Sequence, residues 1–164
     1  MNLDQKVGVL FVCIGNICRS PLAQGIFEHK IQQKGLSKVL SCDSAGIASY
    51  HIGSLPHPLS QAVARKRSIE LNHRARLIQK KDFERFQYIL TMEDMVHAEV
   101  MRMQKRYEAS VKIQLMRCYD PLANHLTEVP DPYYSDMEMY EEVFQILDRS
   151  CEAFLAHLIE QYSW

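Results

Sequence analysis

The chain has 164 residues, of which 47% are hydrophobic, and a formal net charge of −1 at pH 7. This length fits one domain, residues 1–164, with a single core, and the balanced charge excludes a protein held on nucleic acid or membranes by net charge alone. The five cysteines show no Cys-x2-Cys pairing, so neither a disulfide framework nor a zinc site is indicated, and a reducing compartment, the cytoplasm, is expected. No segment approaches the ~20 apolar residues of a membrane-spanning helix.

Apolar periodicity predicts strands that alternate with helices. In chain order, the expected elements are a strand over 6–12, a helix over 20–34, a strand over 39–44, a helix over 59–69, a strand over 88–92, a helix over 92–107, a strand over 111–116 and a helix from 140 to 162. Such an alternation predicts a parallel sheet covered by helices on both faces. Because ligands of such folds bind at the carboxyl ends of the strands, the loop after the first strand is a candidate site.

Charge is unevenly distributed along the chain. Residues 61–81 carry seven basic side chains against one acidic side chain, and residues 128–160 carry nine acidic against one basic. Charge runs are usually solvated faces, and this is the expectation here. The alternative is that the basic stretch attracts anionic partners or lipid head groups.

The most informative segment joins the first strand to the first helix. It reads Val12-Cys13-Ile14-Gly15-Asn16-Ile17-Cys18-Arg19-Ser20-Pro21. Ser20-Pro21 predicts the helix start, with Ser20 as N-cap and proline at the first helical position. Successive backbone N–H groups of such a loop, the helix dipole and the guanidinium of Arg19 together form a trap for phosphate. The same positive field would hold Cys13 as a thiolate.

Three motifs make the chain similar to the low molecular weight protein tyrosine phosphatases. They are the loop from Cys13 to Arg19 followed by Ser-Pro, the run Asp43-Ser44-Ala45-Gly46, and the run Asp131-Pro132-Tyr133-Tyr134. The resemblance implies a flavodoxin-like α/β fold, a single-domain four-stranded parallel sheet in the order 2-1-3-4 with helices on both faces. It also implies hydrolysis of protein phosphotyrosine and of aryl phosphates, without a cofactor or a metal.

The chemistry needs a nucleophile, donors for the phosphate oxygens and an acid for the leaving group. Cys13 would be the nucleophile that forms a cysteinyl-phosphate, Arg19 the phosphate clamp, and Asp131 the general acid and base. The phosphate-binding positions would be Ile14, Gly15, Asn16, Ile17, Cys18 and Ser20. The less specific interpretations are a buried, inert cysteine at a strand end for Cys13 and a proline-rich turn for Asp131.

The resemblance further implies that the loop is supported from outside. Ser44 and His73 would hydrogen-bond to the side chain of Asn16 and keep the loop open for phosphate. Besides capping the helix, Ser20 would donate its hydroxyl proton to the thiolate of Cys13.

The rim and one cysteine complete the expected site. Tyr50, Tyr133 and Tyr134 would form aromatic walls around an aryl ring. Cys18 either packs beneath the loop or traps oxidised Cys13 as a reversible disulfide, which makes it a redox candidate.

Three other classes of protein share these features. Phosphoarginine phosphatases of the same fold tend to carry threonine at the position of Ile14, and related arsenate reductases need two further cysteines in the region 80–90, which has none. A non-catalytic phosphotyrosine-binding or redox-sensing protein would keep the pocket without turnover. The expected partners are phosphotyrosine-containing proteins, with no nucleic acid and no stable membrane association, and the chain is expected to be a monomer or a weak dimer.

Overall fold

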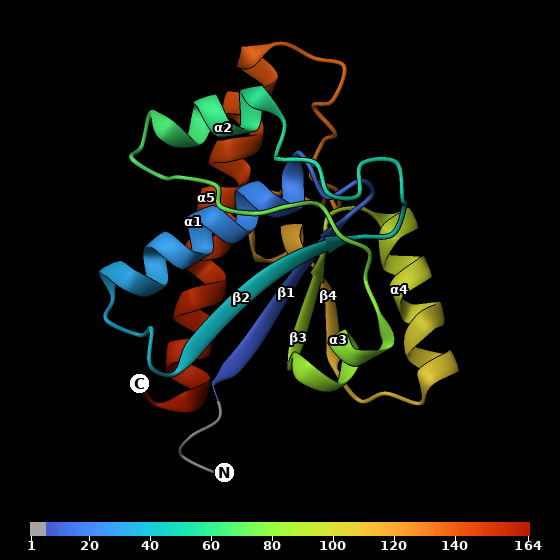
Figure 1. Ribbon diagram of the computed structural model, residues 1–164. Helices are drawn as coiled ribbons and strands as arrows, with labels where there is room; N and C mark the ends of the chain where they lie inside the picture. The colour runs from blue at the N-terminus through green and yellow to red at the C-terminus, as the bar shows by residue number, and fades with distance from the viewer. Residues whose placement is uncertain (1–5) are drawn as a thin grey trace.

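Four parallel strands in the order β2-β1-β3-β4 form the centre of the fold (Figure 1). The predicted strand order is therefore confirmed. The structure is a computed structural model, and it describes residues 6–164. The elements are β1 (Val7–Cys13), α1 (Arg19–Gln33), β2 (Leu40–Gly46), α2 (Pro58–Arg65), α3 (Lys80–Arg85), β3 (Tyr88–Thr91), α4 (Asp94–Tyr107), β4 (Lys112–Leu115), a 3-10 turn η1 (Met116–Tyr119) and α5 (Met137–Tyr162). Across residues 6–164, no helix is long and apolar enough to cross a membrane.

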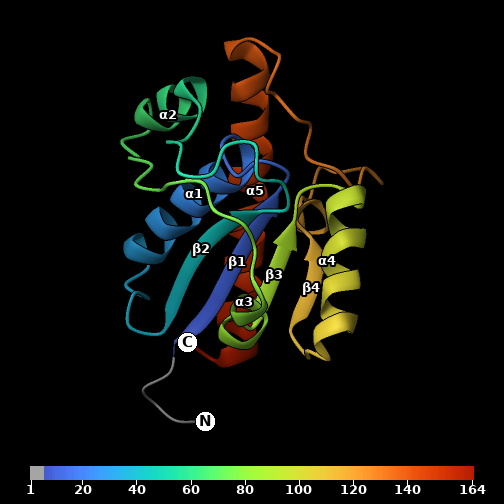
Figure 2. The same cartoon turned by 45° about the vertical axis from the view of Figure 1, so that its right-hand side comes forward.

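The sheet separates two apolar cores, because alternate residues of a strand point to opposite faces. Val9 and Phe11 of β1 pack into the core under α1 and α5, whereas Leu10 and Val12 pack into the core under α3 and α4. Figure 2 shows these two layers of helices on either side of the sheet. Burial on both faces explains why β1 reads as a continuous apolar run rather than as an alternating one.

Helix boundaries differ from the predicted ones at several ends. The start of α1 was predicted one residue late: the helix begins at Arg19, its N-cap is Cys18, and Pro21 is its third residue. Proline is tolerated there because the N–H groups of a first turn lack intrahelical partners. The end of α2 also differs: the helix ends at Arg65 rather than near residue 69. Ser68 takes a left-handed φ of 59° in the turn that follows.

No element was predicted between residues 69 and 88, and the structure has the short helix α3 there. Its first turn carries a capping box, in which the N–H of Gln79 donates to Asp82 over 2.7 Å. Six residues are too few to show helical periodicity. Four of the seven basic residues in 61–81 pair with acidic side chains of the chain: Arg65 with Glu70, Lys66 and Arg67 with Glu141, and Arg76 with Asp82. These pairs fit the interpretation of a structural, solvated face.

Candidate active site

The loop 14–18 lies at the carboxyl end of β1, between a buried cysteine and a buried arginine. Cys13 ends β1 and is 3% exposed, and Arg19 opens α1 and is 1% exposed. An arginine this deeply buried requires fixed partners for its charge. The geometry therefore holds the two predicted reactive side chains at the floor of one depression.

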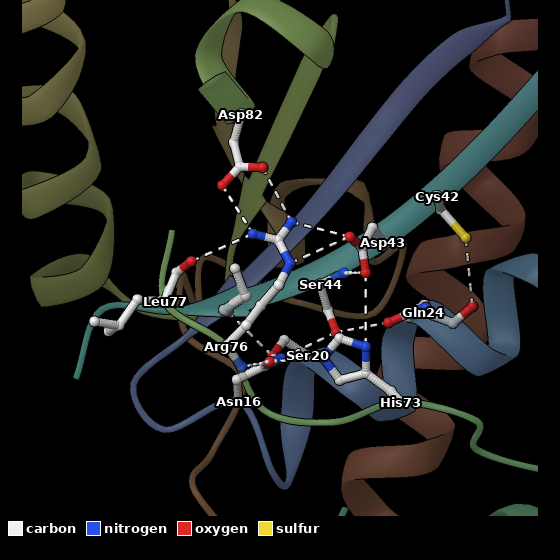
Figure 3. Close-up of polar contacts among 11 residues, drawn as sticks. Asn16, Ser20, Gln24, Cys42, Asp43, Ser44, His73, Arg76, Leu77 and Asp82 are labelled. Carbon is white, nitrogen blue, oxygen red and sulfur yellow. Dashed lines mark hydrogen bonds and ion pairs between the residues drawn. The ribbon is translucent and has the colours of Figure 1, made fainter. Parts of the chain in front are cut away.

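The side chain of Asn16 fixes the loop from inside (Figure 3). Its amide nitrogen donates to Ser44 Oγ over 3.0 Å and to Ser20 Oγ over 2.8 Å, and its amide oxygen accepts from the N–H of Arg76 over 3.0 Å. His73 Nε2 lies 2.7 Å from the same oxygen, which requires the tautomer that carries a proton on Nε2. These bonds hold Asn16 at a left-handed φ of 57°, a conformation that asparagine tolerates better than most residues. The structure thus contains both contacts expected for Ser44 and His73.

His73 serves as a neutral donor in this network. Burial lowers the pKa of His73, and the charge of Arg76 lowers it further, while Asp43 opposes the shift. A neutral imidazole with its proton on Nε2 meets the requirement of the Asn16 oxygen.

Ser20 faces Cys13 and does not cap the helix, so the N-cap prediction was wrong. Its hydroxyl oxygen lies 3.0 Å from Cys13 Sγ and accepts from Asn16, and its longer contact is 3.4 Å to the carbonyl of Ala45. The N-cap position falls on Cys18, which makes no side-chain cap bond. The Asn16 amide takes one lone pair of the oxygen, which leaves the single hydroxyl proton for the Ala45 carbonyl or, when Cys13 is a thiolate, for its sulfur. Donation over the shorter contact, to the sulfur, would stabilise the thiolate.

The run Asp43-Ser44-Ala45-Gly46 ends in a glycine because the loop packs directly on it. A Cβ on Gly46 would lie 2.6 Å from the carbonyl oxygen of Ile14 and 3.1 Å from the backbone nitrogen of Asn16. Any side chain there would push the loop outward. The sequence identified this run as one of the three motifs of the family resemblance. The steric reason for its glycine is visible only in the three-dimensional structure.

Arg19 is held by partners that the sequence motifs did not identify. Its Nη1 donates to Glu93 Oε2 over 2.7 Å and to the carbonyl of Val129 over 2.9 Å. Burial opposes the charge of Arg19, but the neighbouring Cys13, Glu93 and Asp131 together raise its pKa. Glu93 lies two positions after the end of β3, as the N-cap of α4, and an acidic residue near that edge of a parallel sheet was the available signal.

Asp131 lies at the mouth of the depression, on the other side of Arg19. Its Oδ2 is 3.6 Å from Arg19 Nη2, and its side chain is 46% exposed. The carboxylate therefore faces both the buried arginine and solvent. A carboxylate placed at this edge can reach a group bound above Cys13 and can exchange protons with water.

Above the loop the depression opens into a pocket of about 370 Å³. Its floor and walls are Cys13, Ile14, Gly15, Ile17, Cys18, Arg19, Tyr50, His51, Asp131, Tyr133 and Tyr134. Tyr50 and Tyr134 are 80% and 96% exposed, so aromatic rings stand at the rim while the sulfur lies at the bottom. His51 carried no signal in the sequence; a Cβ on Gly15 would lie 2.9 Å from its ring, so the ring packs directly on the loop backbone.

Cys18 is buried beneath the loop and contacts α5. Its Sγ lies 3.4 Å from the hydroxyl of Tyr140. Burial raises the pKa of the Cys18 thiol to about 12, which the bond to Tyr140 opposes and the nearby Cys13 and Asp131 reinforce. Cys18 is consequently a protonated thiol in the same pocket as Cys13. The five cysteines all lie within the described residues, and each is a free thiol.

Comparison with known proteins gives one consistent family. Residues 8–163 match the family described as low molecular weight phosphotyrosine protein phosphatase. The human protein of that name is 38% identical over 148 residues, which cover 90% of this chain and 92% of that protein.

Solved structures agree with the sequence match. A protein tyrosine phosphatase from Entamoeba histolytica superimposes with a TM-score of 0.87 at 33% identity, covering 96% of this chain and 99% of that one. A Drosophila arginine phosphatase also superimposes with a TM-score of 0.87 at 33% identity, covering 92% of this chain and 96% of that one.

Proposed function

The chain belongs to the low molecular weight phosphotyrosine protein phosphatase family, whose members are enzymes, and we propose that it hydrolyses protein phosphotyrosine. The reaction proceeds through a cysteinyl-phosphate on Cys13. The observation that carries the proposal is the contact of Cys13 with Ser20 at 3.0 Å, in a pocket that the buried Arg19 also lines. A hydroxyl donor and a cation around one sulfur favour a thiolate and its dianionic substrate.

In the first step, the Cys13 thiolate attacks phosphorus in line with the phenolic oxygen. The loop N–H groups and Arg19 stabilise the charge on the three remaining phosphate oxygens. As the P–O bond breaks, Asp131 gives its proton to the departing phenolate. The S–P bond formed and the P–O bond broken leave a phosphorylated cysteine and a neutral phenol.

In the second step, water replaces the phenol. Asp131, now a carboxylate, takes a proton from the water that attacks the phosphorus. The S–P bond breaks, Cys13 leaves as a thiolate that the Ser20 hydroxyl stabilises, and inorganic phosphate is released. No step uses a metal, and within the described part of the chain no group of three or more His, Cys, Asp or Glu side chains is arranged to hold one.

The rim supports an aryl substrate. The pocket places Tyr50, Tyr133 and Tyr134 above a sulfur that is 3% exposed, so a phosphate must stand on a long, flat group to reach it. Aromatic rings of the rim would contact a phenyl ring favourably. A phosphoserine side chain is too short for the same depth.

A substrate panel tests this function. Three peptides of one sequence that carry phosphotyrosine, phosphoserine or phosphoarginine are incubated with the protein in EDTA, and phosphate release is measured. We expect phosphotyrosine to be hydrolysed at least about a hundredfold faster than either of the others, because the pocket is deep and its walls are aromatic. Faster release from phosphoarginine would assign to the chain the activity that the Drosophila relative's name states.

Arsenate reduction and phosphotyrosine binding without turnover have separate tests. An arsenate reductase would oxidise thioredoxin when arsenate is added, whereas the proposed enzyme would not. A non-catalytic phosphotyrosine-binding or redox-sensing protein would bind the phosphotyrosine peptide without releasing phosphate.

We propose a redox role for Cys18 in the same site. Hydrogen peroxide oxidises the Cys13 thiolate to sulfenic acid and is itself reduced to water. The Cys18 sulfur then forms a bond to Cys13 Sγ, and its proton leaves with the hydroxide as a second water. Both thiols are free and both line the same pocket, which supports this step.

Cys18→Ser tests that role. We expect the wild-type enzyme to recover most of its activity when dithiothreitol follows peroxide, and Cys18→Ser to recover little, because an unprotected sulfenic acid is oxidised further. Activity before peroxide is the control for folding. Equal recovery of the two proteins would refute the role and leave Cys18 as a packing residue.

We further propose a monomer or weak dimer in the cytoplasm that acts on phosphotyrosine-containing proteins. Five free thiols support a reducing compartment.

A further inference from the structure

The carboxylate of Asp131 is held within its own loop by a hydrogen bond from Tyr133. The backbone N–H of Tyr133 donates to Asp131 Oδ1 over 3.2 Å, and the other carboxylate oxygen lies 3.6 Å from Arg19 Nη2. One oxygen of the Asp131 carboxylate thus faces Arg19, and the other accepts a hydrogen bond from the backbone of Tyr133. Whatever sets the position of Tyr133 also sets the position of Asp131.

The ring of Tyr133 packs against two histidines from the segment that leads into α2. Its centroid lies 5.6 Å from the ring of His51 and 5.9 Å from the ring of His57, the latter at an interplanar angle of 68°. The contact with His57 is edge-to-face, a favourable and directional arrangement of rings, whereas the ring of His51 is tilted at 39°. The acid loop is therefore held from outside by residues that the chemistry does not use.

His57 is itself fixed on two further elements. It stacks on Tyr140 of α5 with centroids 5.2 Å apart and an angle of 21°, and its Nδ1 accepts the N–H of Leu59 over 3.1 Å as the N-cap of α2. Burial lowers the pKa of His57, and the neighbouring His51 lowers it further. A neutral ring is what the cap requires, because a protonated Nδ1 could not accept this bond. One side chain therefore joins α2, α5 and the acid loop.

We propose that His57 is a positioning residue for the general acid: its ring, seated on Tyr140, holds Tyr133 and through it sets the carboxylate of Asp131 over the leaving oxygen. This inference rests on the proposed function, because it presupposes that Asp131 protonates the leaving group. A displacement of about 1 Å of a reacting group costs up to roughly a hundredfold in rate, so a ring two contacts away can influence the first step.

The test uses substitutions of His57 that remove either its aromatic ring or its helix-capping acceptor, but not both. Asparagine is a good N-cap without an aromatic ring, and phenylalanine keeps a ring without a cap acceptor. For each variant, kcat/KM is measured with phenyl phosphate, whose leaving group needs a proton, and with 2,4-dinitrophenyl phosphate, whose leaving group does not. A merely structural defect would lower both values together.

We expect His57→Asn to lower kcat/KM about tenfold for phenyl phosphate and less than about twofold for 2,4-dinitrophenyl phosphate. His57→Phe should stay within about twofold of wild type on both substrates and should lose thermal stability, because α2 loses its cap. His57→Ser, a second variant that keeps the cap, replaces His57→Asn if the latter does not fold.

Asp131→Asn is the reference for the pattern and should show it more strongly. If Asp131→Asn shows the leaving-group dependence and His57→Asn does not, the inference about His57 is overturned while the proposed function stands. If neither variant shows it, Asp131 is not the acid, and both fail. Equal losses on the two substrates in His57→Asn also overturn the inference.

Discussion

Cys13→Ser should lower kcat/KM for p-nitrophenyl phosphate by at least about 10⁴-fold, because a serine hydroxyl in this environment is not ionised and the thiolate is the attacking group. The substitution exchanges one small buried atom and leaves the Ser20 hydroxyl with an oxygen as partner. We therefore expect the thermal midpoint to stay within a few degrees of wild type. The measurement is initial rates in EDTA at saturating and limiting substrate.

Cys118→Ser is the matched control for this substitution. Cys118 is exposed and lies in η1, and it does not line the pocket. Its replacement should leave kcat/KM unchanged within about twofold, since it alters no group near phosphorus. Retention of more than about one per cent of the activity in Cys13→Ser would mean that another residue attacks the phosphate.

Arg19→Lys should have the second largest effect, a loss of about 10³-fold in kcat/KM, or roughly 4 kcal/mol of transition-state stabilisation. Nη1 of Arg19 is occupied by Glu93 and by the carbonyl of Val129, so the planar group can satisfy these partners and still present its other N–H groups to phosphate. The ammonium of a lysine is compact and lacks the forked donor geometry of a guanidinium, so it cannot contact Glu93 and bind the phosphate oxygens in the same way at once. Conservation of charge is therefore not conservation of function here.

Arg74→Lys is the control for the general effect of exchanging arginine for lysine. Arg74 is exposed and donates to the carbonyl of Gly53, and we expect its variant to retain activity within about twofold. Inorganic phosphate, the product of the proposed reaction, should compete with substrate and should bind Arg19→Lys much more weakly than wild type. An Arg19→Lys variant with nearly normal kcat/KM would show that charge alone suffices.

The loop at the end of β1 could be predicted from sequence because its chemistry is concentrated in consecutive residues. Cys13, Asn16, Arg19 and Ser20 lie within eight positions, and a strand, a loop and a helix leave little freedom in how they meet. The alternation of elements predicted a parallel sheet, and the order of its strands came only from the resemblance to a family.

Partners supplied from distant elements could not be predicted in this way. Glu93 lies 74 positions from Arg19, and the Val129 carbonyl belongs to a loop whose path no periodicity specifies. The aromatic contacts of His57 depend on how α2 and α5 pack. Each of these contacts is a property of tertiary packing, which local patterns do not encode.

Boundary errors had local physical causes. Ser20 has the residue type of an N-cap, but its hydroxyl bonds to Cys13 and Asn16 instead. The start of α5 was placed too late, at Tyr140, because apolar periodicity begins there, whereas the cap is Asp136, whose side chain accepts from the N–H of Met139. A cap signal precedes the periodic signal in such a helix.

The most direct test of the central claim is to trap the phosphorylated enzyme. Asp131→Asn is mixed with 2,4-dinitrophenyl phosphate, whose leaving group needs no acid, so that the intermediate forms but the water that should hydrolyse it lacks its base. Denaturing quench and mass spectrometry should then find an increase of about 80 Da, one phosphoryl group, on the peptide that contains Cys13. The same treatment of a Cys13→Ser, Asp131→Asn double variant should give none. A phosphoryl group on another residue, or dinitrophenol release with no phosphorylated protein, would contradict the account.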